Sequence, residues 1–117
     1  MGLDPDCLFC KIARREIPSE VVHEDGTMLA FRDINPQAPT HILIIPKCHV
    51  PTLNDLEEQH QTLIGRMFLL AAQLAADEGI AQTGYRCVFN CMGGAGQSVF
   101  HIHMHLLGGR PLHWPPG

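Results

Sequence analysis

Three histidines alternate with apolar residues near the C-terminal end of the chain. The stretch GQSVFHIHMHLLGG, residues 96–109, places His101, His103 and His105 at every second position. Imidazoles this close together can ligate a metal, titrate on a solvated surface, or act as nucleophile and acid–base catalyst. Alternate side chains of a strand share one face, roughly 6.6 Å apart along it. We therefore expect the three histidines to form a row on one side of a strand.

One metal ion does not account for all three histidines. Three alternating residues span roughly 13 Å, whereas a zinc–nitrogen bond is about 2 Å long. A site with two of the histidines and a further ligand from elsewhere stays open, and so does a merely solvated face. We expect the intervening apolar residues to project from the opposite side into a core beneath a helix: Phe100, Ile102, Met104 and Leu106.

A glycine-rich segment comes just before the histidines. The letters CMGGAGQSV contain Gly93, Gly94, Gly96 and the hydroxyl of Ser98. Glycine lets a backbone turn its N–H groups toward an anion, and a serine adds a further donor. Such loops by themselves are most often only turns. Next to a row of imidazoles, the segment favours a phosphate held beside a nucleophile.

Composition limits the classes of function. The chain has 117 residues, a formal net charge of −4 and eight histidines. An acidic balance argues against nucleic acid as the main partner but leaves a mononucleotide open. No apolar run is as long as a membrane span, and five cysteines without a secretory leader argue against a disulfide framework. We expect one soluble domain, residues 1–117, in the cytoplasm.

Hydrophobic periodicity and turn signals predict an α+β fold. Asp6 is expected to cap a short helix over residues 7–15, and an Asn54–Glu57 capping box to open a long amphipathic helix that stops at Gly79. Asp25 and Gly26 favour a hairpin turn. The expected strands cover residues 19–25, 27–34, 41–46, 84–91 and 99–107. They form a five-stranded, mainly antiparallel sheet with one long and one short helix.

Together the motifs resemble a known family. GQSVFHIHMHLLGGR is similar to the signature of the histidine-triad superfamily. FRDINPQAPTHILIIPKCH and the closing HWPPG resemble the branch of histidine-triad nucleotide-binding proteins that hydrolyse purine nucleoside phosphoramidates. The match covers nearly the whole chain in the right order.

The resemblance implies a covalent mechanism that needs no cofactor. His103 would attack the α-phosphorus of an adenosine or guanosine 5′-phosphoramidate, and water would release AMP or GMP from the nucleotidyl-histidine. A backbone carbonyl would fix its tautomer. His101 and His105 would flank the phosphate, with His41 as the fourth histidine. Ser98 and nearby N–H groups would stabilise charge on the phosphate oxygens.

The resemblance also implies the nucleotide-binding residues. Asp33 would accept hydrogen bonds from both ribose hydroxyls. The other residues implied in nucleotide binding are Phe9, Ile12, Phe31, Ile34, Asn90, Gly96, Gln97, Ser98, Val99 and Trp114. Trp114 resembles a tail residue that reaches the partner subunit's site. The family forms homodimers in which two five-stranded sheets join into one of ten strands.

A structural zinc ion is the open point. Cys7 and Cys10 resemble the half-site of some members, completed there by His49 and His101. Cysteine and histidine in this spacing suit tetrahedral zinc. The tail and the APTH segment, however, resemble a branch that usually lacks zinc. The other interpretation is two thiols on one short helix.

Two other classes of function stay open at this stage. One is a nucleotide-binding interaction or regulatory protein whose catalysis is incidental, which needs the same residues. The other is a purely metal-binding module, which leaves Asp33, Asn90 and Ser98 unexplained.

Overall fold

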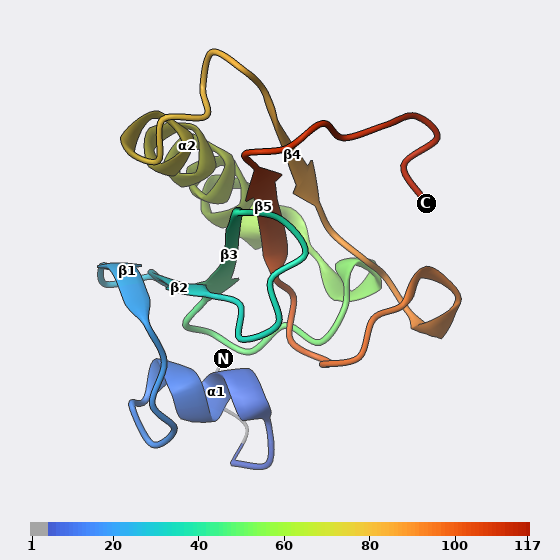
Figure 1. Cartoon of the computed structure of the whole chain (residues 1–117). Coiled ribbons are helices and arrows are strands. Elements are labelled where there is room, and N and C mark those ends of the chain that lie inside the picture. Colours follow the sequence, from blue (N-terminus) through green and yellow to red (C-terminus); the bar gives the residue numbers. More distant parts are fainter. Residues whose placement is uncertain (1–4) are drawn as a thin grey trace.

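The computed structural model describes residues 5–117 and contains one five-stranded sheet (Figure 1). Its strands lie in the order β1-β2-β3-β5-β4, and every neighbouring pair is antiparallel. The strands are β1 (Val21–Glu24), β2 (Met28–Arg32), β3 (Thr40–Pro46), β4 (Tyr85–Val88) and β5 (Met104–Gly108). The predicted α+β class and the five-stranded antiparallel sheet are confirmed.

The short helix α1 (Leu8–Ala13) begins one residue later than predicted. Its N-cap is Cys7, whose Sγ accepts the backbone N–H of Cys10 at 3.4 Å. The prediction that Asp6 caps this helix is wrong. Both residues can accept a hydrogen bond at a helix start, and the sulfur of Cys7 is the one turned back toward the first turn.

The long helix α2 (Gln61–Asp77) is preceded by two 3₁₀ turns, Leu53–Asp55 and Glu58–His60. One capping box is formed by Thr52 and Asp55 at the first of these turns and another by Glu57 and His60 at the second, so the predicted Asn54–Glu57 box is wrong. The Asp55 carboxylate accepts the Thr52 backbone N–H at 3.1 Å, and the Thr52 hydroxyl accepts the Asn54 N–H at 3.1 Å. The predicted stop at Gly79 is confirmed by its left-handed φ of 76°.

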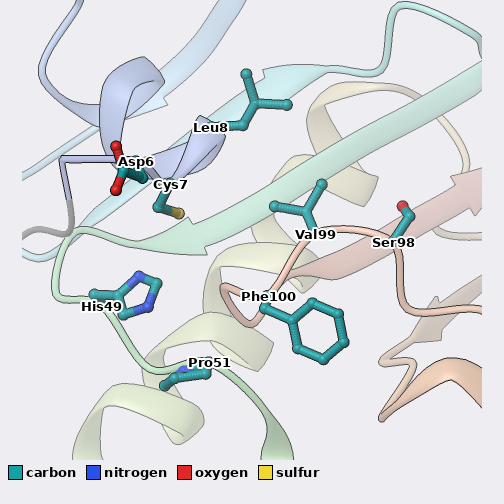
Figure 2. Close-up of a pocket in the computed structure, with 8 residues that line it drawn as sticks. All are labelled: Asp6, Cys7, Leu8, His49, Pro51, Ser98, Val99 and Phe100. Atoms are coloured by element: carbon teal, nitrogen blue, oxygen red, sulfur yellow. The ribbon is translucent and has the colours of Figure 1, made fainter.

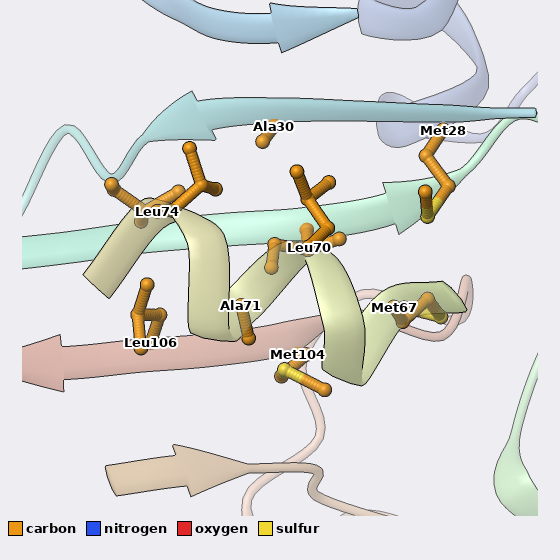
Figure 3. Close-up of a cluster of buried hydrophobic side chains, with 10 residues drawn as sticks. Met28, Ala30, Met67, Leu70, Ala71, Leu74, Met104 and Leu106 are labelled. Carbon is orange, nitrogen blue, oxygen red and sulfur yellow. The ribbon is translucent and has the colours of Figure 1, made fainter. Parts of the chain in front are cut away.

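The sheet is covered on both faces. Even-numbered residues of β2, β3 and β5 face α2, and Figure 3 shows this cluster. It contains Met28, Ala30, Ile42, Ile44, Met104 and Leu106 with Met67, Leu70, Ala71 and Leu74 of the helix. Odd-numbered residues of β2 and β3 face α1, where Leu29, Phe31, Leu43 and Ile45 pack with Phe9 and Ile12. The strict alternation of strand side chains produces this division.

Strand β5 begins at Met104, later than predicted, so His105 is the one triad member inside it. The ladder with β3 stops at the Ile44–Met104 pair, and the Ile102 N–H bonds instead to the carbonyl of Val50 at 2.8 Å. Phe100 lies outside the ladder and is 47% exposed, so its predicted core position is wrong. The predicted burial of Ile102, Met104 and Leu106 is confirmed.

The tail after β5 is irregular, as its three prolines predict. It is joined to β4 where Arg86 donates to the carbonyl of His113 at 3.0 Å. Within residues 5–117, no helix combines the length and apolarity needed to cross a membrane.

Candidate active site

His103 is held as a neutral imidazole with one free nitrogen. Its Nδ1 lies 2.8 Å from the carbonyl oxygen of His101. Because a carbonyl only accepts, Nδ1 carries the proton and Nε2 keeps its lone pair. The ring is buried, with the edge of Phe9 packed at 4.9 Å between ring centroids. Burial lowers the pKa of His103. The result is an uncharged nucleophile near neutral pH.

A chain of hydrogen bonds sets the tautomers of two further histidines. The backbone N–H of Gln37 donates to Nδ1 of His41 at 3.0 Å, so neutral His41 carries its proton on Nε2. That Nε2 lies 2.8 Å from Nδ1 of His105, which therefore accepts and carries its own proton on Nε2. Burial lowers the pKa of His105 to about 4 and also lowers that of His41. His105 is thus a fixed, neutral N–H donor.

His101 lies in a different environment from the other two triad members. It is fully buried, and its Nε2 lies 2.8 Å from the carbonyl oxygen of Pro46. Nε2 therefore carries the proton, and the bare Nδ1 faces two sulfurs, at 3.4 Å from Cys7 and 3.5 Å from Cys10. The three histidines do not form the single row that strict strand alternation predicts, because His101 and His103 precede the ladder.

A cavity of about 380 Å³, here called the histidine cavity, opens beside His103 and His105. Its size is in the range of small-molecule sites. The remaining lining residues are Leu8, Phe9, Ile12, Ile17, Pro18, Ser19, Phe31, Arg32, Asp33, Ile34, Leu43, Ser98 and Val99. One part of this wall is apolar, and the other presents two imidazoles, two hydroxyls, a guanidinium and a carboxylate. Such a cavity suits an apolar ring joined to a polar, anionic group.

Asp33 lies at the junction between the two parts. Its Oδ1 accepts the backbone N–H of Asn35 at 2.8 Å, and its Oδ2 lies 3.5 Å from Nε2 of His41. The N–H nearest to Oδ2 is Nε2–H of His41, which already donates to Nδ1 of His105 at the shorter distance of 2.8 Å. The carboxylate therefore keeps accepting capacity toward a ligand.

Four of the expected nucleotide-binding residues do not line this cavity: Asn90, Gly96, Gln97 and Trp114. Gln97 is buried and ties the glycine-rich loop together, since its Oε1 accepts the N–H of Met92 at 2.8 Å and its Nε2 donates to the carbonyl of Pro51 at 2.8 Å. Gly96 supplies the left-handed turn, with φ 87°. Trp114 is 83% exposed in the tail.

Sequence reasoning missed several contributors, including Pro18 and Ser19 of the cavity lining. Leu43 lines the cavity, and alternation along strand 41–46 could have found it, since it shares a face with His41. Leu8 also lines it, from the first position of α1. The backbone N–H of Gln37 orients His41, and no side-chain pattern signals such a contact.

The cysteine–histidine cluster consists of Cys7, Cys10, His49 and His101, whose four ligand atoms lie within 4.8 Å of one another. A tetrahedral zinc ion with bonds of about 2.3 Å to sulfur and 2.0 Å to nitrogen separates its ligands by about 3.3 to 3.8 Å. Sγ of Cys10 lies 3.3 and 3.5 Å from the two Nδ1 atoms, which are 3.3 Å apart. Donor types and spacing fit zinc.

A second group, Asp33, His41 and His105, also brings ligand atoms within 4.8 Å. Its two imidazole nitrogens are 2.8 Å apart. This separation is a hydrogen-bond length, shorter than the about 3.3 Å between two nitrogens on one zinc ion. We assign this contact as a hydrogen bond.

Comparisons with known proteins find relatives over most of the chain. The HIT domain family matches residues 14–112. The purine nucleoside phosphoramidase of Escherichia coli (strain K12) is 57% identical over 107 residues, 92% of this chain and 90% of that protein. The 14 kDa zinc-binding protein of Zea mays is 53% identical over 116 residues, 97% of this chain and 90% of that protein. The crystal structure of a HIT family hydrolase from Legionella pneumophila Philadelphia 1 has a TM-score of 0.95 and 57% identity, covering 96% of this chain and 100% of that one.

Proposed function

This chain belongs to the HIT domain family, and we propose that it hydrolyses purine nucleoside 5′-phosphoramidates, releasing AMP or GMP and an amine. The observation that carries the proposal is the tautomer of His103. Its Nδ1–H is held by the His101 carbonyl, which leaves the Nε2 lone pair available beside the histidine cavity. The similarity to a phosphoramidase over most of both chains supports the substrate class.

The first step forms a nucleotidyl-histidine. The Nε2 lone pair of His103 attacks the α-phosphorus while the bond from phosphorus to the amine nitrogen breaks. The bonding pair stays on that nitrogen, which takes a proton from water and leaves as the amine. The positive charge that develops on the His103 ring is stabilised because its Nδ1–H donates to the carbonyl oxygen of His101. The Nε2–H of His105 donates to a non-bridging oxygen of the phosphate, a role for which its fixed tautomer suits it.

The second step releases the nucleotide. The oxygen of a water molecule attacks the same phosphorus, and the bond from phosphorus to Nε2 of His103 breaks. The pair returns to Nε2, and the water gives one proton to solvent. Ser98, which is exposed and lines the cavity, is a hydroxyl available to orient that water. The enzyme returns to its starting protonation state.

The nucleoside occupies the rest of the cavity in this proposal. The purine packs against the apolar lining of Phe9, Ile12 and Phe31. Asp33 accepts hydrogen bonds from both ribose hydroxyls, because a carboxylate offers two acceptor oxygens to a diol. Asn35 helps to hold that carboxylate in place.

We also propose that the cysteine–histidine cluster holds a structural zinc ion, which supplies a tetrahedral cross-link and no chemistry of the reaction. His101 then acts as a positioning residue. Its Nδ1 faces the cluster, its Nε2–H donates to Pro46, and its carbonyl orients His103. Thiolate ligands favour a reducing compartment, in agreement with the expected cytoplasmic location.

A homodimer is part of the proposal. β4 is at one edge of the sheet, so its outer side is available to pair with another strand. Each copy is a single domain of residues 1–117. Antiparallel pairing of β4 with β4 of the second copy joins the two five-stranded sheets into one sheet of ten strands. It also places the tail residue Trp114 near a partner subunit. Sedimentation velocity at several protein concentrations tests this arrangement.

The test of the activity is intact mass after rapid mixing with adenosine 5′-phosphoramidate, quenched without acid because the P–N bond is acid-labile. The wild-type protein should show a transient adenylyl adduct and release AMP. His103→Ala should show neither, while His23→Ala, on β1, should behave as wild type. AMP binding without adduct or turnover in the wild type would instead identify a nucleotide-binding regulatory protein.

A further inference from the structure

Cys7 and Cys10 lie one helical turn apart in the cysteine–histidine cluster. Cys7 is the N-cap of α1, and Cys10 in the first turn donates its backbone N–H to Sγ of Cys7 at 3.4 Å. Both thiols are free, and their sulfurs are within 4.8 Å of each other. Helical residues three apart have Cα atoms about 5 Å apart, inside the range of roughly 4.4 to 6.8 Å found for disulfides. The two sulfurs can therefore form a bond with little movement of the backbone.

A hollow gives small molecules access to one of these sulfurs. It measures about 600 Å³ and is here called the Cys7 hollow (Figure 2). Its lining residues are Asp6, Cys7, Leu8, His49, Pro51, Ser98, Val99 and Phe100. Figure 2 shows Cys7 and His49 on one side of this space, with Val99 and Phe100 on the other. Cys7 is partly exposed, whereas Cys10 is fully buried and is not part of the lining. A small molecule in the hollow therefore reaches Cys7 first.

We propose that Cys7 and Cys10 are a reversible redox site, which hydrogen peroxide entering the Cys7 hollow converts to a disulfide. Cys7 is oxidised first because it borders the hollow, and the buried Cys10 then closes the bond. A dithiol reductant returns both thiols. The site is formed by the thiols themselves, so this inference does not depend on the proposed hydrolysis.

The oxidation balances with hydrogen peroxide as the only co-reactant. Sγ of Cys7 attacks one peroxide oxygen, the O–O bond breaks, and the other oxygen leaves as water with the proton of the Cys7 thiol. Cys7 is then a sulfenic acid. Sγ of Cys10 attacks the sulfur of Cys7 and the S–O bond breaks, so the hydroxyl leaves as a second water with the proton of the Cys10 thiol. Two electrons have passed from the sulfurs to the peroxide.

Closure of this disulfide also changes the surroundings of His101. Nδ1 of His101 lies 3.4 Å from Sγ of Cys7 and 3.5 Å from Sγ of Cys10. The carbonyl of His101 holds Nδ1–H of His103. Because the thiolate is the form of cysteine that binds a metal, a zinc ion in the cluster loses two of its four ligands and leaves. The redox state of the pair thus determines whether the cluster holds a metal beside the residue that orients His103.

The experiment treats the protein, as purified and after loading with zinc, with hydrogen peroxide and then alkylates the remaining thiols. Trypsin cleaves after Lys11 and Lys47, so the peptide of residues 1–11 carries both thiols of the pair and that of residues 48–66 carries Cys48 alone. Peptide 1–11 should lose the mass of two hydrogen atoms and escape alkylation about ten-fold faster than Cys48 is oxidised, because a neighbouring thiol captures the sulfenic acid. Zinc-loaded protein should release its zinc in step with this change, and dithiothreitol should restore both thiols.

Variants separate the roles of the two thiols. Cys10→Ser should stop at the sulfenic acid of Cys7, which dimedone labels. Cys7→Ser should be oxidised at Cys10 about ten-fold more slowly than Cys7 is oxidised in the wild type, because the remaining thiol is buried. Cys48→Ser is the matched control, since it removes a partly exposed thiol outside the cluster, and should form the disulfide at the wild-type rate.

Peptide 1–11 keeping both thiols free while Cys48 is oxidised in the wild type would overturn the redox site. Equal oxidation rates in Cys7→Ser and the wild type would overturn the order assigned to the two thiols. Zinc that stays bound after the disulfide has formed would overturn the link to the metal. Each readout is a mass or a metal content measured without substrate, so none of these outcomes can be confused with failure of the proposed hydrolysis.

Discussion

At the scale of single residues, backbone groups determine which nitrogen of each histidine can react. The carbonyl of His101 holds Nδ1–H of His103, the carbonyl of Pro46 holds Nε2–H of His101, and the N–H of Gln37 points at Nδ1 of His41. Each contact permits one neutral tautomer. The identical side chains of the triad therefore take different roles because their backbone partners differ.

His41→Phe should lower kcat about 10- to 100-fold with a smaller change in KM, because His105 loses the donor that fixes its tautomer. His41→Gln keeps an amide N–H and should retain more of the activity. Steady-state kinetics with adenosine 5′-phosphoramidate measure both. An unchanged kcat in His41→Phe would show that the 2.8 Å contact does not orient His105 for the reaction.

The pH profile follows from burial of these imidazoles. Burial lowers the pKa of His103 and His41 below the usual 6.5, and that of His105 to about 4. A lowered pKa keeps an imidazole neutral into more acidic solution, so kcat/KM should stay level from pH 8 to about pH 6. The acid limb should lie below 6.5. A limb centred at or above 6.5 would mean that a solvent-exposed histidine controls the reaction.

At the scale of elements, the β1–β2 hairpin depends on one carboxylate. Oδ1 of Asp25 accepts the backbone N–H groups of Thr27 and Met28 at 2.8 and 2.9 Å, and Oδ2 lies 2.8 Å from His23. The contact with His23, followed by the backbone donors, holds the pKa of Asp25 well below its usual range. The turn is thereby closed in the register that places Asp33 at the cavity.

Asp25→Ala should destabilise the protein by about 1 kcal/mol, since two turn N–H groups lose their acceptor. Urea unfolding at pH 7 measures the loss, with Gln73→Ala on the exposed side of α2 as the control. Because the folded pKa is depressed, the stabilisation is complete above the unfolded pKa of about 3.9 and is lost as pH falls below it. Equal stability of variant and wild type at pH 7 would contradict this role.

Elements with strong local signals could be predicted from the sequence, and their exact starts could not. The Asp25–Gly26 turn, the apolar strand up to Pro46 and the stop at Gly79 each follow from local chemistry. At the helix starts, several residues can cap within one turn, as with Thr52 and Asn54, and tertiary packing decides between them. The start of β5 depends on where its partner strand ends.

The candidate site, too, could be predicted from the sequence only in part. His105, expected from the alternation of the strand, and Asp33, implied only by the family resemblance, both line the cavity. Gln97 was predicted to bind the nucleotide, but its amide closes a loop, and a loop's internal hydrogen bonds are not visible in a motif. The role proposed for Trp114 depends on a partner subunit, which a single chain does not contain.

At the scale of the whole molecule, the two faces of the sheet serve different purposes. The face under α2 is a continuous apolar core, whereas the face under α1 carries the histidine cavity. The cysteine–histidine cluster joins segments far apart in the chain: α1, the residues after β3 and those before β5. Zinc bound there would hold α1 over the cavity and connect the stability of the fold to the orientation of His103.

This connection predicts how the protein responds to metal. Stoichiometric zinc should raise the melting temperature of metal-stripped wild type by at least several degrees, because a ligand bound only to the folded state stabilises it. Cys10→Ser should lose both the bound zinc and the shift. Cys48→Ser, one residue from His49 but outside the cluster, should keep both. Zinc analysis and thermal melts on the three proteins measure both effects. If zinc did not change the melting temperature of the wild type, the cluster would be thiols and imidazoles that pack without a metal.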